Sequence, residues 1–287
     1  MVEWRLSGSY RSGSGTVRWE RFGESGAEPV VLLHGTPFSS FVWRGVARGL
    51  AGRYATYVWD MPGYGVSEKA AGQDLSLAAL GEVFAGLLDH WGVTRPRVVA
   101  HDSGGAVALG AHLLHGVEYR RLALVDAVTV APWGSPFFRE VGESTDVLAR
   151  LPAGPHEALL RAYVSTASGP GLRPEVMEAL VRPWLGEEGQ AAFYRQLAAR
   201  RRDKEYTDVL ERRYERVVVP TLACWGAEDS WVPVERGREF VSRVRGARLH
   251  VVPDAGHLTP EDGPAELAAV LATFLAGDDA YQVTGRA

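Results

Sequence analysis

Cysteine is almost absent from this sequence. The lone cysteine, Cys224, lies in the apolar stretch PTLACW and has no second thiol in the chain with which to form a disulfide, which fits a reducing compartment. No apolar run approaches the roughly 20 residues that a membrane-spanning helix needs. The first residues, MVEWRLSGSY, lack the charged and then apolar pattern of a secretory signal. We therefore expect a soluble, cytoplasmic protein.

An excess of positive charge and the common cofactor motifs are also missing. Lys and Arg number 31 against 35 Asp and Glu, which gives a net charge of −4, and no basic block stands apart. This balance argues against a nucleic acid or an anionic membrane as a partner. We find no metal-ligand spacing, phosphate-binding glycine loop or dinucleotide fingerprint, so we predict no cofactor and no metal. The expected partner is a small, largely apolar organic substrate, and a homodimer stays open.

What the sequence does contain is a regular alternation of short apolar strands with helical segments. The strand patterns are PVVLLHG, YATYVWD, PRVVAH and RRLALVD in the first half, and VVVPTLACWG and ARLHVVPD in the second. Amphipathic or small-residue helical segments, such as LSLAALGEVFAGLLDHWG, separate them. Fully apolar strands that alternate with helices predict an α/β fold, with a mostly parallel sheet covered on both faces.

The alternation stops between residues 131 and 215. Proline and glycine in APWGSPFF break the pattern, and the following residues are helical and rich in Arg, Tyr and Trp. We predict one core domain, residues 1–130 and 216–287, interrupted by a helical cap of residues 131–215. The alternative, two separate domains, would leave each with an incomplete sheet. The run RRDK at residues 201–204 is interpreted as a solvated helix face.

The segment AHDSGG, at the end of a strand, offers two nucleophiles, Asp102 and Ser103. In open parallel sheets, active sites form beyond the carboxyl ends of the strands. A sharp strand-to-helix turn there exposes one side chain only if the residues two before and two after it are small. With Asp102 at the apex these are Ala100 and Gly104, whereas Ser103 would place His101 in a crowded position. The turn favours Asp102, although an isolated Asp here could instead cap the helix.

Two further side chains complete a candidate catalytic triad. Asp229 follows the strand PTLACW in the segment GAEDSWVP, and His257 follows the last strand in DAGHLTPED. Either residue by itself would be interpreted as an ordinary loop residue. Their joint occurrence, acid and then base at the ends of the last two strands, is the order that follows a nucleophile in hydrolases built on such a sheet.

With these residues in place, the sequence resembles the α/β-hydrolase superfamily. More narrowly it is similar to the epoxide hydrolase and haloalkane dehalogenase branch, which uses an aspartate nucleophile. The motifs that carry the resemblance are LHGTP, DMPGYGVS, AHDSGG, GAEDSWVP and AGH, and it extends from about Pro29 to the last helix. It implies the α/β-hydrolase fold, with a mostly parallel eight-stranded sheet flanked by helices and an inserted helical cap.

The resemblance also implies a covalent mechanism. Asp102 would attack an sp³ carbon to form an ester, and His257, held by Asp229, would activate the water that hydrolyses it. The backbone N–H groups of Thr36 and Ser103 would form the oxyanion hole. Some members of the superfamily carry the acid at the position of Asp126, so this residue is an alternative to Asp229.

The leaving group decides between two reactions. An epoxide oxygen needs a proton donor, and the resemblance implies a cap tyrosine. We predict Tyr194, in AAFYRQ, as catalytic and Tyr163 as the next candidate, lining the substrate site with Trp133 and Phe137. The alternative for Tyr194 is a helix core residue with a polar tip.

Epoxide opening to a diol is therefore our first interpretation, and dehalogenation of a haloalkane or haloacid is the second. The tryptophan and asparagine that haloalkane dehalogenases use to hold the halide are replaced here by Ser103 and Thr36. Ser103 also departs from the epoxide hydrolases, where Trp is common. A haloacid would need a cap arginine such as Arg195 for its carboxylate. A third hypothesis is a natural-product-tailoring or ligand-binding protein that does not hydrolyse its ligand.

Overall fold

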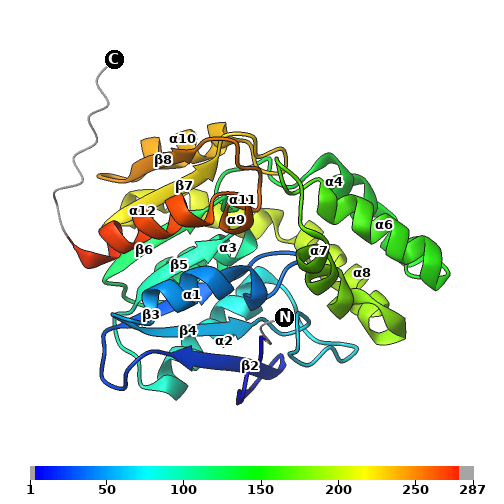
Figure 1. Cartoon of the computed structure of the whole chain (residues 1–287), viewed down its shortest axis with the longest axis horizontal. Coiled ribbons are helices and arrows are strands. Elements are labelled where there is room, and N and C mark those ends of the chain that lie inside the picture. The colour runs from blue at the N-terminus through cyan, green and yellow to red at the C-terminus, as the bar shows by residue number, and fades with distance from the viewer. Residues whose placement is uncertain (1–3, 278–287) are drawn as a thin grey trace.

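The computed structural model describes residues 4–277, and within them the strands form one eight-stranded sheet in the order β1-β2-β4-β3-β5-β6-β7-β8 (Figure 1). The strands are β1 (Gly8–Ser12), β2 (Gly15–Phe22), β3 (Pro29–Leu33), β4 (Ala55–Asp60), β5 (Arg97–His101), β6 (Arg121–Val125), β7 (Thr221–Gly226) and β8 (Arg248–Val252). β1 and β2 form an antiparallel hairpin that pairs with the edge of β4. Every other pair is parallel, which confirms the predicted mostly parallel sheet.

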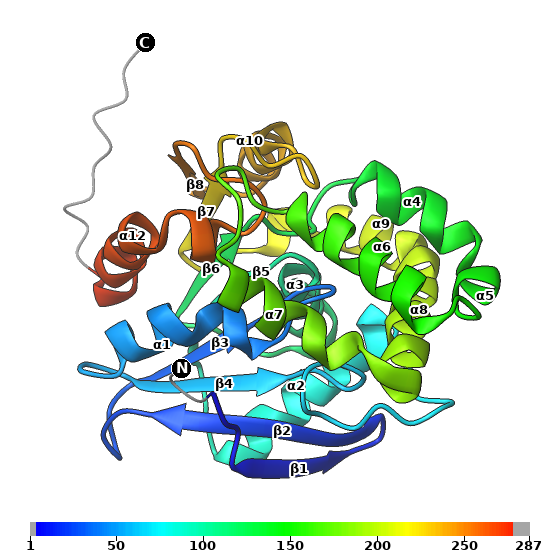
Figure 2. The same cartoon turned by 45° about the vertical axis from the view of Figure 1, so that its right-hand side comes forward.

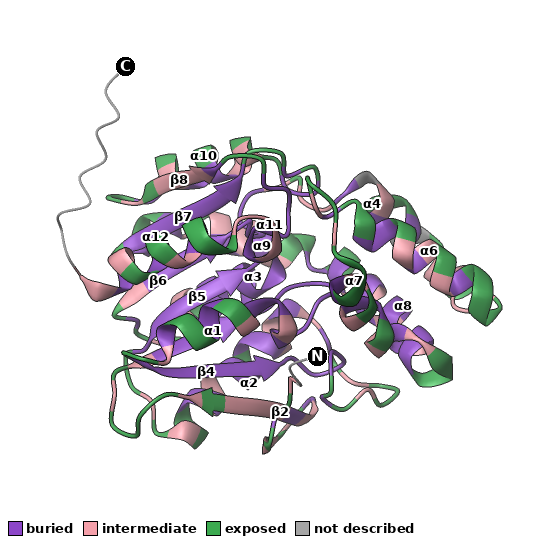
Figure 3. Cartoon of the chain, in the orientation of Figure 1, coloured by how far each residue is buried: buried purple, intermediate pink, exposed green. Residues whose placement is uncertain are grey.

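Helices cover both faces of this sheet. Those of the core are α1 (Arg44–Leu50), α2 (Leu77–Trp91), α3 (Ser103–His115), α10 (Val234–Arg243), α11 (Thr259–Asp262) and α12 (Pro264–Ala276), preceded by the short 3₁₀ helix η1 (Ser40–Trp43). α1 packs against α12, and α2 packs against α3. The central strands are buried along their whole length between these layers (Figure 3), which explains their continuous apolar runs.

Between β6 and β7 the described chain forms helices only. They are α4 (Pro136–Glu143), α5 (Thr145–Leu148), α6 (Ala153–Ser165), α7 (Pro174–Val181), η2 (Arg182–Trp184), α8 (Gly186–Arg202), α9 (Lys204–Glu211) and η3 (Tyr214–Arg216). These helices lie beyond the carboxyl ends of the parallel strands (Figure 2). They correspond to the predicted cap, whose boundaries at residues 131 and 215 stay a prediction. Residues 1–3 and 278–287, which the sequence analysis assigned to the core, lie outside the described residues.

None of the helices in residues 4–277 is long and apolar enough to cross a bilayer. The carboxyl ends of the strands meet at one edge of the sheet, beneath the helical insertion. The loops after β3, β5, β6, β7 and β8 therefore converge on one place. Four predicted site residues lie in these loops: Thr36, Asp102, Asp229 and His257.

Candidate active site

The site is built around a sharp turn between β5 and α3. Asp102 sits at its apex with φ 49° and ψ −125°, a backbone conformation that costs a residue with a side chain on the order of 1–3 kcal/mol. The surrounding backbone holds it there, because the carbonyl of Asp102 accepts hydrogen bonds from the N–H groups of Gly105 and Val128, both at 2.9 Å. The apex is the aspartate, as the small-residue pattern predicts, and Ser103 begins α3.

The crowding behind this turn explains the glycines. A Cβ atom on Gly104 would lie 2.4 Å from the backbone oxygen of His34, and one on Gly35 would lie 2.3 Å from Cβ of Asp102. Real Cβ atoms do not approach other atoms so closely. The loop after β3 can therefore reach the apex only because both positions lack a side chain.

That loop supplies a hydrogen-bond donor to the carboxylate of Asp102. The backbone N–H of Thr36 donates to Oδ1 of Asp102 at 2.7 Å, and the backbone of Ser103 also hydrogen-bonds the same carboxylate. Burial would raise the pKa of Asp102, but the imidazole of His257, whose Nε2 lies 3.4 Å from Oδ2, outweighs burial and lowers that pKa. Asp102 is therefore held as a carboxylate, with two backbone donors where an oxyanion hole is expected.

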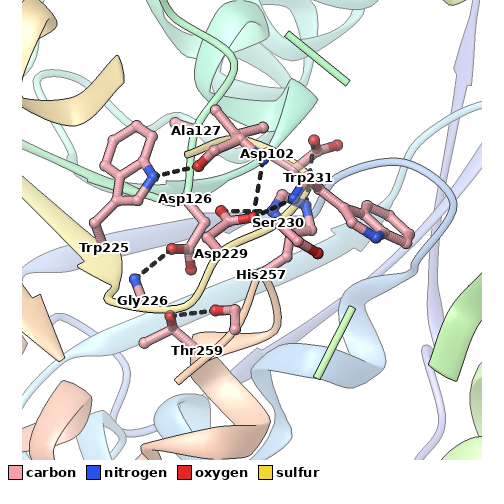
Figure 4. Close-up of polar contacts among 12 residues, drawn as sticks. Asp102, Asp126, Ala127, Trp225, Gly226, Asp229, Ser230, Trp231, His257 and Thr259 are labelled. Atoms are coloured by element: carbon pink, nitrogen blue, oxygen red, sulfur yellow. Dashed lines mark hydrogen bonds and ion pairs between the residues drawn. The ribbon is translucent and has the colours of Figure 1, made fainter. Parts of the chain in front are cut away.

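His257 lies between two carboxylates (Figure 4). Its Nδ1 is 2.9 Å from Oδ2 of Asp229, and its Nε2 is 3.4 Å from Oδ2 of Asp102. The other oxygen of Asp229 accepts backbone N–H bonds from Trp231 and Val232 at 2.8 and 2.9 Å. Within the described chain, Nε2 forms no hydrogen bond, which leaves this nitrogen available to a water molecule beside the nucleophile.

The charges around His257 determine its protonation. Burial by itself would lower its pKa, but the carboxylates of Asp229 and Asp102 together raise that pKa well above the usual value. His101 packs beside the ring, and its Nε2 lies 2.8 Å from the backbone carbonyl of His257. Burial, followed by repulsion from His257, lowers the pKa of His101 to about 3. His101 is therefore neutral and orients the backbone of His257.

Asp126, the alternative triad acid, does not contact the imidazole through a hydrogen bond. It is fully buried, and its Oδ1 accepts the N–H of Gly226 at 2.7 Å (Figure 4). Burial first, and the charge of Asp229 second, raise the pKa of Asp126 well above its usual range. In this geometry Nδ1 of His257 pairs with Asp229. Asp126 forms no hydrogen bond with the imidazole, and its raised pKa favours the neutral carboxyl group.

A pocket with an empty volume of about 310 Å³ opens over Asp102 beneath the helical insertion. The residues that line it are Thr36, Asp102, Ser103, Val128, Trp133, Gly134, Ser135, Phe138, Tyr163, Arg200, Trp231 and Val232. Four of these twelve residues are aromatic, and the ring of Tyr163 stacks on Trp231 with centroids 4.4 Å apart. Trp231 in turn stacks on His257 at 4.9 Å. Within residues 4–277, no group of three or more His, Cys, Asp or Glu side chains is arranged to hold a metal ion.

Only some of the residues predicted for the substrate site line this pocket. Trp133 and Tyr163 line it, as expected. Phe137 does not, because its ring stacks on the outer side of Tyr163 at 4.3 Å, and the neighbouring Phe138 lines the pocket instead. Tyr194 is also outside the pocket: its hydroxyl lies 3.2 Å from Nδ1 of His156, within the insertion. The structure therefore corrects the predicted positions of Phe137 and Tyr194.

Comparison with known proteins agrees with this architecture. The model of the Alpha/beta hydrolase family matches residues 30–270. The chain belongs to the α/β hydrolase family. A solved α/β hydrolase fold protein from Burkholderia ambifaria is 41% identical, with a TM-score of 0.88, and the match covers 93% of this chain and 97% of that one.

More distant relatives support the same family, but the enzymes among them are named for different reactions. A 2-hydroxy-6-oxononadienedioate/2-hydroxy-6-oxononatrienedioate hydrolase of Cupriavidus pinatubonensis is 28% identical over 81% of each chain. The enol-lactonase of Burkholderia xenovorans, at 20% identity over 94% of this chain and all of that one, shares the fold with a TM-score of 0.77. This protein is thus a hydrolase of the α/β fold, and the epoxide hydrolase branch is not singled out.

Trp231 and Arg200 are among the pocket residues of this α/β hydrolase that sequence reasoning missed. Trp231 follows Asp229 by two positions, and a tryptophan so close to the triad acid was a usable signal. Arg200 precedes the run RRDK, of which Asp203 is buried while Arg201, Arg202 and Lys204 are exposed. The burial of Arg200 and of Asp203 does not follow from composition, since charged residues in a helix are normally solvated.

The crowding at Gly104 generates a first prediction. Gly104→Ala should lower the free energy of unfolding by about 1–3 kcal/mol, because the new methyl group must displace the backbone of His34. It should also reduce hydrolysis by shifting the Thr36 donor. Gly45→Ala in α1 is the matched control, since its methyl group meets no atom within 4 Å. Chemical denaturation would measure both, and equal stability of the two variants would contradict the steric argument.

A second prediction separates the two acids. Asp229→Asn should abolish most activity, whereas Asp126→Asn should retain it. Since the pKa of Asp126 is raised in the folded state, the unfolded chain binds fewer protons and wild-type stability falls as the pH rises through this window. Asp126→Asn should therefore gain stability relative to wild type at pH 8 and gain less at pH 5. Thermal unfolding at both pH values is the measurement, and loss of activity in Asp126→Asn with Asp229→Asn active would reverse the assignment.

Proposed function

We propose that this hydrolase opens an epoxide to a diol through an ester on Asp102. The observation that carries the proposal is the environment of that carboxylate: Oδ1 accepts the N–H of Thr36, and Oδ2 faces the imidazole of His257. Oδ1 would therefore remain in the donor pair while Oδ2 attacks carbon. A carboxylate can displace at an sp³ carbon, which an alcohol on the same scaffold would not do.

Ser103 is a poor nucleophile in this arrangement. Its Oγ lies 3.1 Å from Oγ1 of Thr36 rather than on an imidazole nitrogen. A serine nucleophile needs an adjacent base to take its proton, and His257 has Asp102 in that place. The role proposed for Ser103 is to donate its backbone N–H to the Asp102 carboxylate.

The first step forms a bond between Asp102 and an epoxide carbon and breaks the carbon–oxygen bond of the ring. The alkoxide then takes the phenolic proton of Tyr163, which lines the same pocket. Burial, with the charge of Asp102 second, raises the pKa of Tyr163, so its hydroxyl stays protonated until a strong base forms beside it. This matches the proton donor to the alkoxide that develops.

The second step hydrolyses the ester. Alkylation removes the charge of Asp102, which is one of the charges that raise the pKa of His257. His257 then loses its proton to solvent, while the Tyr163 phenolate regains one. Neutral His257 takes a proton from water as the hydroxide attacks Cγ of Asp102. Collapse releases the diol and the Asp102 carboxylate with His257 protonated again, so the cycle balances as epoxide plus water giving diol.

Halide release has weaker support. The indole N–H groups that could hold a halide are already bonded elsewhere: Trp231 donates to Oγ1 of Thr166 at 2.9 Å, and Trp133 donates to Oγ1 of Thr207 at 3.3 Å. Dehalogenation therefore stays second to epoxide opening. A protein without hydrolysis would not need the Asp102–His257–Asp229 set. A cytoplasmic location, drawn from the lone cysteine, belongs to the same proposal.

The ester intermediate gives the central test. His257→Gln should stall after alkylation, because no base remains to activate water, and general-base assistance is typically worth about 10²–10⁴-fold. Intact-protein mass spectrometry after incubation with an epoxide panel should show an adduct, and peptide mapping should place it on Asp102. The double variant His257→Gln, Asp102→Asn should show no adduct. An adduct on Ser103 would overturn the proposal.

Two tyrosine variants test the identity of the proton donor. Tyr163→Phe should slow epoxide opening by about 10²-fold or more, because the alkoxide loses its acid. Tyr194→Phe should leave the rate within a few-fold of wild type, since Tyr194 bonds His156 outside the pocket. Single-turnover kinetics of ester formation is the readout. A slow Tyr194→Phe beside an unaffected Tyr163→Phe would assign the donor to Tyr194 instead.

A further inference from the structure

Arg200 is a charged residue of the pocket that the proposed chemistry does not use. It lies near the end of α8, its side chain is 1% exposed, and it lines the same pocket as Asp102. Nε, Nη1 and Nη2 all lack a hydrogen-bond partner within residues 4–277. A guanidinium carries five N–H donors, and a buried donor left unsatisfied is costly enough that native structures rarely keep one without a purpose.

The neighbouring acid does not satisfy this group. Nη1 of Arg200 lies 3.1 Å from Oδ2 of Asp203, close enough for an ion pair but without hydrogen-bond geometry. The other oxygen of Asp203 accepts the N–H of Leu77 at the start of α2 at 3.0 Å. Asp203 thus ties α8 to the core and balances the charge of Arg200, while the N–H donors of Arg200 stay available.

A second unused donor lies one helical turn before Arg200. Gln196 is fully buried, and its Oε1 accepts a hydrogen bond from the hydroxyl of Tyr64 at 3.1 Å. This bond fixes the orientation of the amide, and its Nε2 has no partner in the described part of the chain. Residues four apart in a helix share a face, so Gln196 and Arg200 present their free donors on the same side of α8.

We infer that Arg200, assisted by Gln196, binds a carboxylate of the substrate while Asp102 attacks the epoxide carbon of the same molecule. A planar carboxylate accepts two parallel N–H bonds from a guanidinium. The pocket is narrow and aromatic, which suits a small acid with an apolar body. The inference rests on the proposed function for its reaction, and it names the substrate class: epoxides of organic acids.

Arg195 provides a matched control on the same helix. Its Nη2 donates to the backbone carbonyl of Lys69, and the residue borders an outer groove with Tyr194 instead of the pocket over Asp102. The structure thus removes Arg195 as the carboxylate-binding cap arginine that the sequence offered. Both arginines lie on α8, so replacing either changes the net charge equally.

Binding of matched pairs, a carboxylate and its amide, tests the inference without any turnover. Calorimetric titration of wild-type enzyme with acetate, butyrate and phenylacetate, each beside its amide, should show at least one acid binding about 10-fold or more tightly than its amide. Arg200→Gln should remove this preference. Arg200→Lys should keep part of it, because lysine has the positive charge but not the two parallel N–H donors of a guanidinium. Arg195→Gln should keep it. If no acid is preferred over its amide by wild-type enzyme, or if Arg195→Gln loses the preference as fully as Arg200→Gln, the inference is overturned.

The design separates this inference from the proposed function. Arg200-dependent binding of acids with no turnover of an epoxide panel would sustain the carboxylate site and reject epoxide opening. Turnover of neutral epoxides with no advantage for epoxy acids such as 3-phenylglycidate over the corresponding amide would sustain epoxide opening and reject the carboxylate site. Should Arg200→Gln fail to fold, which circular dichroism would show, the wild-type preference and the Arg200→Lys variant still decide the question.

Discussion

The backbone at Asp102 is held at a positive φ, and the chemistry of the site depends on this one constraint. The turn lifts the carboxylate out of the sheet, brings Thr36 onto one oxygen and leaves the other beside His257. It can form only because Gly104 and Gly35 allow two backbone segments to meet there. The surrounding sheet and α3 supply the packing that holds a strained residue in place.

Burial forces the charges of this site into one arrangement. Asp102, Asp229 and Asp126 all interact with His257, and the low-dielectric interior cannot hold every one of these groups charged. Burial, followed by the charge of Asp229, raises the pKa of Asp126, the carboxyl group that forms no ion pair with the imidazole, and so favours its protonated form. The pKa of Asp102 is lowered instead, because the imidazole of His257 lies beside it. In the proposed mechanism, forming an ester on Asp102 would remove one of these charges and lower the pKa of His257, which would favour its action as a base.

The sequence predicts the parts of this structure that depend on local patterns. Apolar strands locate the sheet, and small residues around Asp102 identify the apex, because both follow from steric rules within a few residues. The hairpin strand β1 was not recognised, since its pattern of alternating exposed and half-buried residues is weak. The pocket could not be predicted in detail, because it depends on how the inserted helices pack. Phe137 and Phe138, adjacent in sequence, face different sides.

The positions of residues around α8 show why choosing the wrong residue of this helix changes the predicted substrate site. Successive residues turn by about 100°, so Gln196 and Arg200 lie within about 40° of each other, while Arg195 is about 140° from Arg200. Tyr194 and Arg195 therefore border the outer groove, whereas Arg200 lines the pocket over Asp102. An epoxide has no charge, so a site for neutral epoxides would gain nothing from a buried guanidinium. In the proposed reaction, Arg200 of the cap would bind the charged group of the substrate while Asp102, at the turn between β5 and α3, attacks its reactive carbon.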